Sequence, residues 1–285
     1  MRLRIAPVII GLLLMAWPPS HGTLWAAEPQ SLPEASPIAA AALVANTQDV
    51  VPGRPFDVAL RLRLPDGWHT YWRNTGDAGA PTAIAWTLPA GFTVGPLAWP
   101  IPTRYVTGPV VSYGLAGDVW LLTRITPPAD LRSGSTATLT AEADWLVCAH
   151  ICIPEAATLS LRLPVAAAAR PAPPELRQGF DAARGKLPEP YPRTATVGKD
   201  RDRLLLDVEM PAAATVAIDE AWFFPDRFGV IDNAGAQTHE RTGQGLRVIL
   251  PPAAPPSTPD AVSGVLVLKR AGERRGYSIT ASNRS

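Results

Sequence analysis

Two cysteines, Cys148 and Cys152, are the residues of this sequence best suited to chemistry, and the sequence contains no others. Three residues separate them, within the segment WLVCAHICIP that covers 145–154. Any intramolecular disulfide must therefore join these two side chains; otherwise both thiols serve exchange or metal binding. Three uses remain open at this point: a redox-active dithiol, a structural bridge and a metal site.

The chain must turn between the two cysteines if they are to form a bond. Four positions of extended strand place the Cα atoms roughly 13 Å apart, whereas a disulfide requires about 4.4 to 6.8 Å. The flanking segments 136–147 and 157–163 predict strands, with 148–154 as their connection. Reactive groups are commonly presented on such connections.

A purely structural bridge would add little stability here. Closing so small a loop removes about 2 kcal/mol of unfolded-chain entropy, against about 4.7 kcal/mol for a loop of about 100 residues. A protein of this size buries enough apolar surface to be stable without so short a disulfide loop. The spacing of the two cysteines, together with the export signal described below, therefore favours redox exchange over a structural bridge, and a structural bridge over a metal site.

His150 lies between the cysteines and keeps the metal alternative open. Two sulfurs and an imidazole form a soft ligand set that suits copper(I) or zinc, although closed zinc sites need a fourth ligand such as His69 or His239. The alternative function is thus a non-enzymatic periplasmic binding module that either holds copper through Cys148, His150 and Cys152 or carries a purely structural disulfide. As a neighbour of a thiolate, His150 would instead lower the pKa of either cysteine. We expect neither a bound metal nor a cofactor.

The amino terminus predicts export. Arg2 and Arg4 precede an apolar run of 13 residues at 5–17, and small residues follow up to Ala27. This is the layout of a secretory signal, and the run is shorter than the roughly 20 residues that span a membrane. We expect a cleaved signal peptide at 1–27, no transmembrane segment in the mature chain, and a compartment in which disulfides persist.

Composition narrows the fold and the function. A net charge of +1 over 285 residues is too neutral for a protein that binds nucleic acid or an anionic membrane. The 32 prolines and 22 glycines interrupt the chain too often for long helices, and the short segments between them predict an all-β fold. The sequence has no phosphate-binding glycine loop and no G-x-S-x-G or H-E-x-x-H motif.

The predicted strands fall into two groups, which we interpret as two β-sandwich domains. Segment 56–64 alternates apolar and polar residues and predicts a half-buried strand. Between the groups, Leu176, Phe180 and Ala183 recur at helical spacing among prolines. The expected parts are a flexible leader at 28–37, a redox-active sandwich at 38–170, a linker with one short helix at 171–192 and a second sandwich at 193–285. Further predicted strands are 68–72, 82–88, 92–97, 110–113 and 119–125, then 203–208, 215–218, 221–224, 246–250, 262–268 and 277–281.

Three ordered motifs carry a family resemblance: GWHTYWRNTGDAGAP at 67–81, SYG at 112–114 and DWLVCAHICIPE at 144–155. Together they resemble the amino-terminal periplasmic region of the DsbD/ScsB family of transmembrane thiol:disulfide reductases. The similarity extends over most of residues 38–285, including AWFFP at 221–225 and GVLVL at 264–268. The close cysteine spacing is more similar to the ScsB branch, which is linked to copper tolerance.

The resemblance implies immunoglobulin-like sandwiches, a periplasmic location and an electron relay. Cys148 and Cys152 would be the catalytic dithiol, with Cys152 bonding the partner and Cys148 resolving the adduct. Tyr71 and Tyr113 lie in matching motifs and would shield the pair, and His150 is a further supporting residue.

The resemblance also implies partners. These are thioredoxin-like periplasmic proteins and oxidised periplasmic proteins that serve as substrates. Full-length members continue into a membrane core and a thioredoxin-like domain, whereas this sequence ends at Ser285. We therefore expect a free-standing protein that a separate membrane reductant serves.

Overall fold

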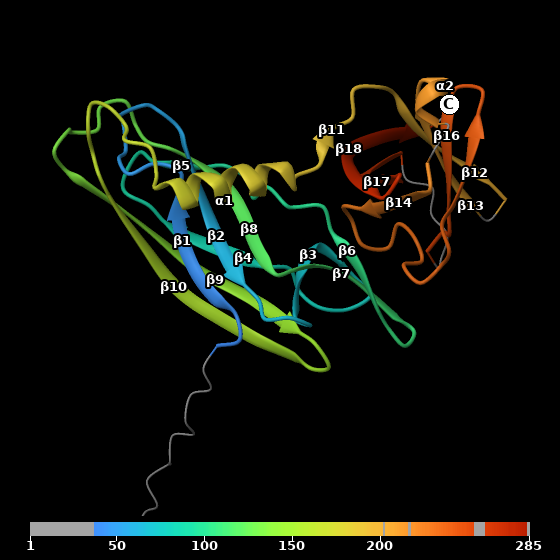
Figure 1. Ribbon diagram of the computed structural model, residues 1–285, viewed down its shortest axis with the longest axis horizontal. Helices are drawn as coiled ribbons and strands as arrows, with labels where there is room; N and C mark the ends of the chain where they lie inside the picture. The colour runs from blue at the N-terminus through green and yellow to red at the C-terminus, as the bar shows by residue number, and fades with distance from the viewer. Residues whose placement is uncertain (1–36, 202, 216–217, 254–259, 284–285) are drawn as a thin grey trace, which may run out of the picture. The chain divides into compact units, whose positions relative to one another are not determined.

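The computed structural model describes residues 37–201, 203–215, 218–253 and 260–283, which are mostly β (Figure 1). The predicted signal peptide at 1–27, and the leader at 28–37 except its last residue, lie outside the described residues. None of the helices in the described ranges has the length and apolar character that a membrane span requires.

Residues 40–164 form two antiparallel sheets. The first sheet has four strands in the order β1 (Ala40–Ala45), β2 (Phe56–Arg63), β8 (Asp118–Thr126) and β5 (Thr93–Val94). The second has six, in the order β10 (Cys152–Pro164), β9 (Thr136–Cys148), β3 (His69–Gly76), β7 (Val110–Ala116) and β6 (Thr103–Thr107), with β4 (Ala83–Thr87) also paired to β9. Buried side chains of both sheets share one cluster, as Leu60 and Leu62 of β2 do with Trp72 of β3, so the sheets pack face to face.

Helix α1 (Pro174–Gly185) follows this sandwich and confirms the short helix predicted from the spacing of Leu176, Phe180 and Ala183. It begins at a proline, which suits the first turn because that position needs no backbone N–H donor. Phe180 is fully buried and its ring meets that of Trp120 on β8 edge to face, 5.2 Å between centroids. Figure 1 shows α1 over the four-stranded sheet.

The position of α1 corrects one expectation. Strand β2 is not half-buried: residues 56–60 are all buried, on both faces of the sheet. Ala59, on the outer face, packs in one cluster with Trp120 and Phe180. The alternation in the sequence marks the inner face correctly but gives no sign that a helix covers the outer one.

The remaining strands form one sheet. Its order is β14 (Glu220–Pro225), β17 (Ala261–Arg270), β18 (Glu273–Asn283), β12 (Ala195–Asp200), β13 (Arg203–Glu209), β16 (Gly245–Leu250) and β15 (Thr238–Thr242), and β11 (Glu189–Pro190) pairs with β18. We call it the C-terminal sheet. Where the sequence predicts a sandwich of two sheets, parallel pairing of β12 with β18 joins all strands into one, and a single core forms inside it.

Two further differences concern local structure. The strand predicted at 215–218 is wrong at its start, because Thr215 ends a one-turn helix, α2 (Ala212–Thr215), and residues 216–217 lie outside the described ranges. Strands β6, β12 and β15 are found where the sequence predicts none. Each is flanked by or contains polar residues, which weakens the alternation on which the prediction depends.

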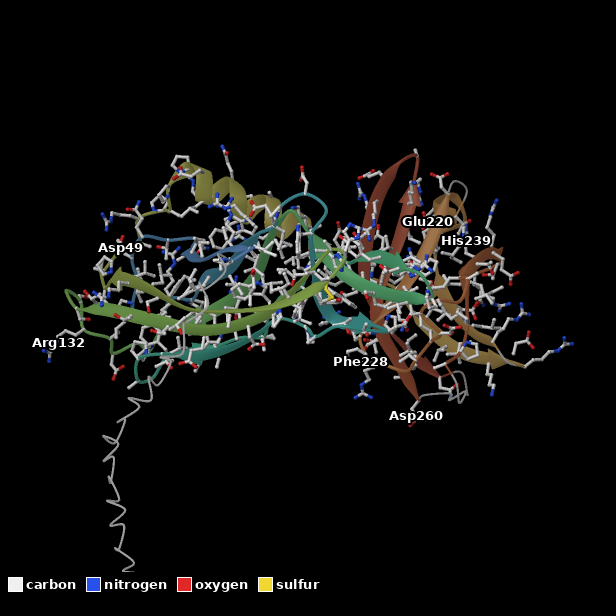
Figure 2. The ribbon with its side chains drawn as sticks, turned by 90° about the horizontal axis from the view of Figure 1, so that it is seen from below. Asp49, Arg132, Glu220, Phe228, His239 and Asp260 are labelled. Carbon is white, nitrogen blue, oxygen red and sulfur yellow. A yellow bond between two sulfur atoms is a disulfide. The ribbon has the colours of Figure 1, made fainter. Side chains whose placement is uncertain are left out.

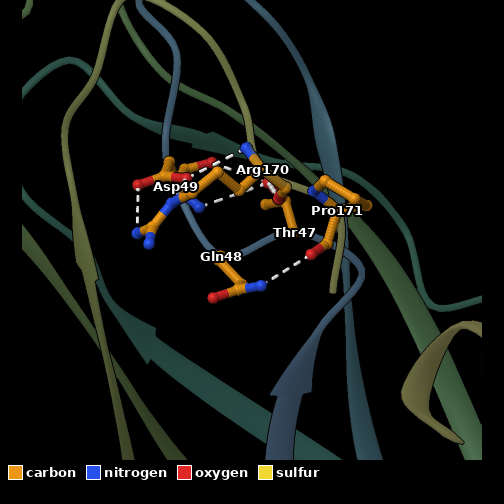
Figure 3. Close-up of polar contacts among 5 residues, drawn as sticks. All are labelled: Thr47, Gln48, Asp49, Arg170 and Pro171. Carbon is orange, nitrogen blue, oxygen red and sulfur yellow. Dashed lines mark hydrogen bonds and ion pairs between the residues drawn. The ribbon is translucent and has the colours of Figure 1, made fainter. Parts of the chain in front are cut away.

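An ion pair fastens the end of the sandwich to the chain after β10 (Figure 3). The carboxylate of Asp49 accepts hydrogen bonds from Nε and Nη2 of Arg170, each at 2.8 Å, and from its backbone N–H at 2.9 Å. Gln48 donates to the carbonyl of Pro171 at 2.8 Å, and Thr47 donates to that of Arg170 at 3.2 Å. The segments after β1 and after β10 are thereby held together.

Candidate active site

Cys148 and Cys152 form a disulfide across the hairpin of β9 and β10 (Figure 2, yellow). Cys148 ends β9, Cys152 begins β10, and the two are register partners with their Cα atoms 4.2 Å apart. The predicted turn between them is confirmed. It is tighter than the sequence indicates, because β10 begins at Cys152 rather than at Ala157 and only 149–151 remain outside the strands.

The two sulfurs differ in how solvent reaches them. Cys148 is 2% exposed, whereas Cys152 is an exposed residue. Its neighbour Ile151 is 65% exposed, so an apolar side chain also faces solvent in this turn. Cys152 is therefore the cysteine of the pair that faces solvent.

Tyr71 on β3 covers the bond from the interior. Its hydroxyl lies 3.0 Å from Sγ of Cys148 and 3.2 Å from Sγ of Cys152. Burial raises the pKa of Tyr71 above its usual value, and a hydrogen bond with Ser112 acts in the opposite direction. The hydroxyl therefore keeps its proton at neutral pH and can donate it to a sulfur.

His69 and Tyr105 complete an aromatic cluster with Tyr71. His69 is the register partner of Cys148. Its ring stacks on that of Tyr105 with 4.0 Å between centroids and meets that of Tyr71 edge to face at 5.6 Å. Burial lowers the pKa of His69, so the imidazole is neutral at neutral pH.

The backbone at a glycine also packs closely against the Tyr71 ring. Gly79 has a φ of +99°, and a Cβ placed there would lie 2.2 Å from Cε1 of Tyr71. Only a residue without a side chain permits this approach of backbone to ring. The segment after β3 thus lies directly on the tyrosine that touches the disulfide.

The other two supporting residues, Tyr113 and His150, make no described hydrogen bond to either sulfur. The hydroxyl of Tyr113 donates to Oδ1 of Asn233, 2.8 Å away in the C-terminal sheet region, and its ring packs edge to face on Phe224. His150 is exposed in the turn between the cysteines. Within the described residues, no group of three His, Cys, Asp or Glu side chains could hold a metal ion.

Sequence comparison places this site in a known family. Residues 40–164 match the family described as thiol:disulfide interchange protein DsbD, N-terminal. This part of the chain belongs to the DsbD N-terminal family. No curated protein matches the chain by sequence.

One solved structure has a similar fold. The N-terminal periplasmic domain of ScsB from Proteus mirabilis aligns with a TM-score of 0.58 and 18% identity, over 84% of this chain and 92% of that one. At this identity the likeness is one of fold. The periplasmic chaperone SfaE (TM-score 0.21, 11% identity, 85% and 98% covered) and the CsuC–CsuE complex of Acinetobacter baumannii (0.22, 12%, 87% and 100%) are far less similar.

Sequence reasoning missed three residues that pack around Tyr71 and His69 in this DsbD N-terminal domain: His69 itself as a partner of Tyr71, then Tyr105 and Gly79. The sequence does hold a signal for His69: it lies two positions before Tyr71, and residues two apart on a strand share a face. Tyr105 lies on β6, which the sequence does not predict, and no local pattern shows that Gly79 folds back onto a ring.

Proposed function

We propose that this protein exchanges thiols and disulfides through Cys148 and Cys152 and relays electrons between other proteins. The observation that carries the proposal is the pairing of an exposed cysteine with a buried one beneath a tyrosine hydroxyl. An inert bridge has no need of such asymmetry. Attack at Cys152 and departure of Cys148 follow directly from it.

A thiolate of a reduced partner attacks Sγ of Cys152 and forms a mixed disulfide, while the bond to Cys148 breaks and leaves its electron pair on that sulfur. The partner's second thiolate then attacks the partner's first sulfur, which is bonded to Cys152 in the mixed disulfide. This closes a disulfide within the partner and releases Cys152 as a thiolate. Two electrons have passed to the pair, the partner has become a disulfide, and solvent protons complete the two thiols. The reverse sequence reduces an oxidised substrate protein.

Tyr71 supports the departure of Cys148. The leaving thiolate forms in a buried position, where a charge without a partner is costly. The Tyr71 hydroxyl, 3.0 Å away and protonated, donates a hydrogen bond to it. The Tyr71 ring packs against the ring of His69, on which Tyr105 stacks, and against the backbone at Gly79.

The wider setting belongs to the same proposal. A signal peptide at 1–27 would export the chain to the periplasm, where thioredoxin-like proteins and a separate membrane reductant supply electrons and oxidised proteins receive them. Residues 38–170 would act as an immunoglobulin-like redox domain and 193–285 as a second domain, joined by 171–192. Family membership of 40–164 and the export signal in the sequence support this setting.

Trapping of mixed disulfides tests the proposal. A Cys148→Ser variant keeps the exposed cysteine and should form a stable mixed disulfide with a thioredoxin-like protein that retains one active-site cysteine, activated as its nitrobenzoate disulfide, because the nitrobenzoate thiolate leaves and no second thiol can reverse the step. A Cys152→Ser variant keeps only the buried sulfur and should trap at least about tenfold less. The doubly substituted protein is the control.

Two results would count against parts of the account. Equal trapping by both single variants would contradict the roles given to the two sulfurs. No trapping by either would remove exchange altogether. Copper(I) titration of the reduced protein then tests the binding module, for which His150→Ala should weaken the affinity.

A further inference from the structure

Strand β3 serves two parts of the molecule. Its first half, 69–71, pairs with β7 and β9 and presents Tyr71 to the disulfide. The pairing with β7 is then interrupted between Tyr71 and Gly76. In the interrupted stretch Trp72 and Asn74 are buried, at 0% and 1% exposed, and both contact the C-terminal sheet.

Both polar atoms of the Asn74 side-chain amide form hydrogen bonds where the pairing of β3 with β7 is interrupted. Nδ2 donates to the carbonyl of Pro225 at 2.8 Å and to that of Arg227 at 3.1 Å, both in or just after β14. Oδ1 accepts from the backbone N–H of Gly76 at 3.1 Å. The bulge of β3 is therefore shaped by backbone atoms of the C-terminal sheet.

A second set of bonds follows immediately along the chain. Asp77 accepts from the N–H of Val111 with Oδ2 and from Nδ2 of Asn233 with Oδ1, each at 2.8 Å. Asn233 in turn accepts from the hydroxyl of Tyr113. Asn233 thus links the residue after β3 to β7, and Asp77 lies two positions before Gly79, whose backbone rests on the Tyr71 ring.

We propose that the loop between β14 and β15 of the C-terminal sheet positions the redox site, with Asn233 of this loop as the positioning residue that holds segment 77–79 on Tyr71 through Asp77. This inference deepens the proposed exchange function and rests on it. The C-terminal sheet touches neither sulfur in any described contact. It affects exchange by fixing the position of the Tyr71 hydroxyl relative to the sulfurs of Cys148 and Cys152.

An exchange of the two side chains tests this link without removing volume. Asn233→Asp keeps the acceptor for Tyr113 but sets a carboxylate against Asp77. In the double variant Asp77→Asn with Asn233→Asp, the amide introduced at 77 can donate to the new carboxylate while its oxygen still accepts from Val111. Gln237→Ala is the matched control, because that amide bridges the backbone of Phe223 within the C-terminal sheet and contacts no part of β3 in the described bonds.

The readouts are the rate of exchange with a reduced thioredoxin-like protein and the thiol pKa of the reduced pair, with urea unfolding to confirm the fold. Asn233→Asp should slow exchange about fivefold and raise the thiol pKa, since a misplaced hydroxyl donates less well to a thiolate. The double variant should return to within about twofold of the original rate, and Gln237→Ala should exchange normally.

The outcomes separate this inference from the function on which it rests. A folded Asn233→Asp protein with the original rate and thiol pKa overturns the inference, and so does a double variant that fails to recover. If the unsubstituted protein does not exchange at all, the proposed function fails instead.

Discussion

At the residue scale, the site depends on the difference between two sulfurs and on one hydroxyl that reaches both. Cys148 and Cys152 could be found from the sequence because they are its only cysteines, and Tyr71 because its motif is similar to the family's. Tyr113 comes from an equally good motif, yet its hydroxyl bonds Asn233. A motif therefore identifies a residue that matters but does not reveal which neighbour it contacts.

Removing the Tyr71 hydroxyl should slow exchange. A hydrogen bond to a charged group contributes about 1.5 to 3 kcal/mol, so Tyr71→Phe should reduce the rate by about tenfold to a hundredfold and raise the pKa of the Cys148 thiol. Stopped-flow measurement with a reduced thioredoxin-like protein gives the rate. Tyr105→Phe is the matched control, since it keeps the stacked ring and has no described bond to a sulfur. Equal rates for the two variants would mean that the hydroxyl has no part in the step.

At the element scale, the hairpin of β9 and β10 is the part that sequence reasoning predicted best. Alternation over 136–147 gives β9 correctly, and the covalent reach of a disulfide requires the turn. The start of β10 was missed because Pro154 interrupts the pattern, although a proline is tolerated on an edge strand. Interactions distant in sequence, such as the one between Asp49 and Arg170, leave no local pattern at all.

Acid should weaken the contact between Asp49 and Arg170. Hydrogen bonds from Arg170 hold the pKa of Asp49 below its usual value of 3.8, so the folded protein binds this proton less readily than the unfolded chain. The contribution to stability is present above that value and is lost as the pH falls through the folded pKa. Urea unfolding of the original protein and of Asp49→Asn should therefore give a difference at neutral pH that shrinks in acid. A difference that is constant with pH would exclude this ion pair as its source.

At the scale of the whole molecule, composition predicts a mostly β protein and the structure agrees. What composition could not predict is that the C-terminal strands join into one sheet, since strand patterns specify faces and not partners. Nor could it predict that α1 buries the outer face of β2, because the helix pattern shows that one side is apolar without naming the surface it meets.

Helix α1 should stabilise the fold without affecting the chemistry. Phe180 is fully buried against Trp120, so Phe180→Ala should lower the free energy of unfolding by about 3 to 5 kcal/mol. The exchange rate of the folded protein should not change, because the helix packs on the sheet that lacks both cysteines. Urea unfolding and exchange assays on the same sample measure both quantities. A loss below about 1 kcal/mol would mean that the helix is not packed as described.

The equilibrium reduction potential of the bond between Cys148 and Cys152 tests the central claim most directly. It can be measured by titrating the purified protein in glutathione redox buffers and following the free thiols. We expect a value above about −300 mV, in the range of disulfides that exchange with other proteins. A value well below about −300 mV, typical of inert bridges in secreted proteins, would contradict the account.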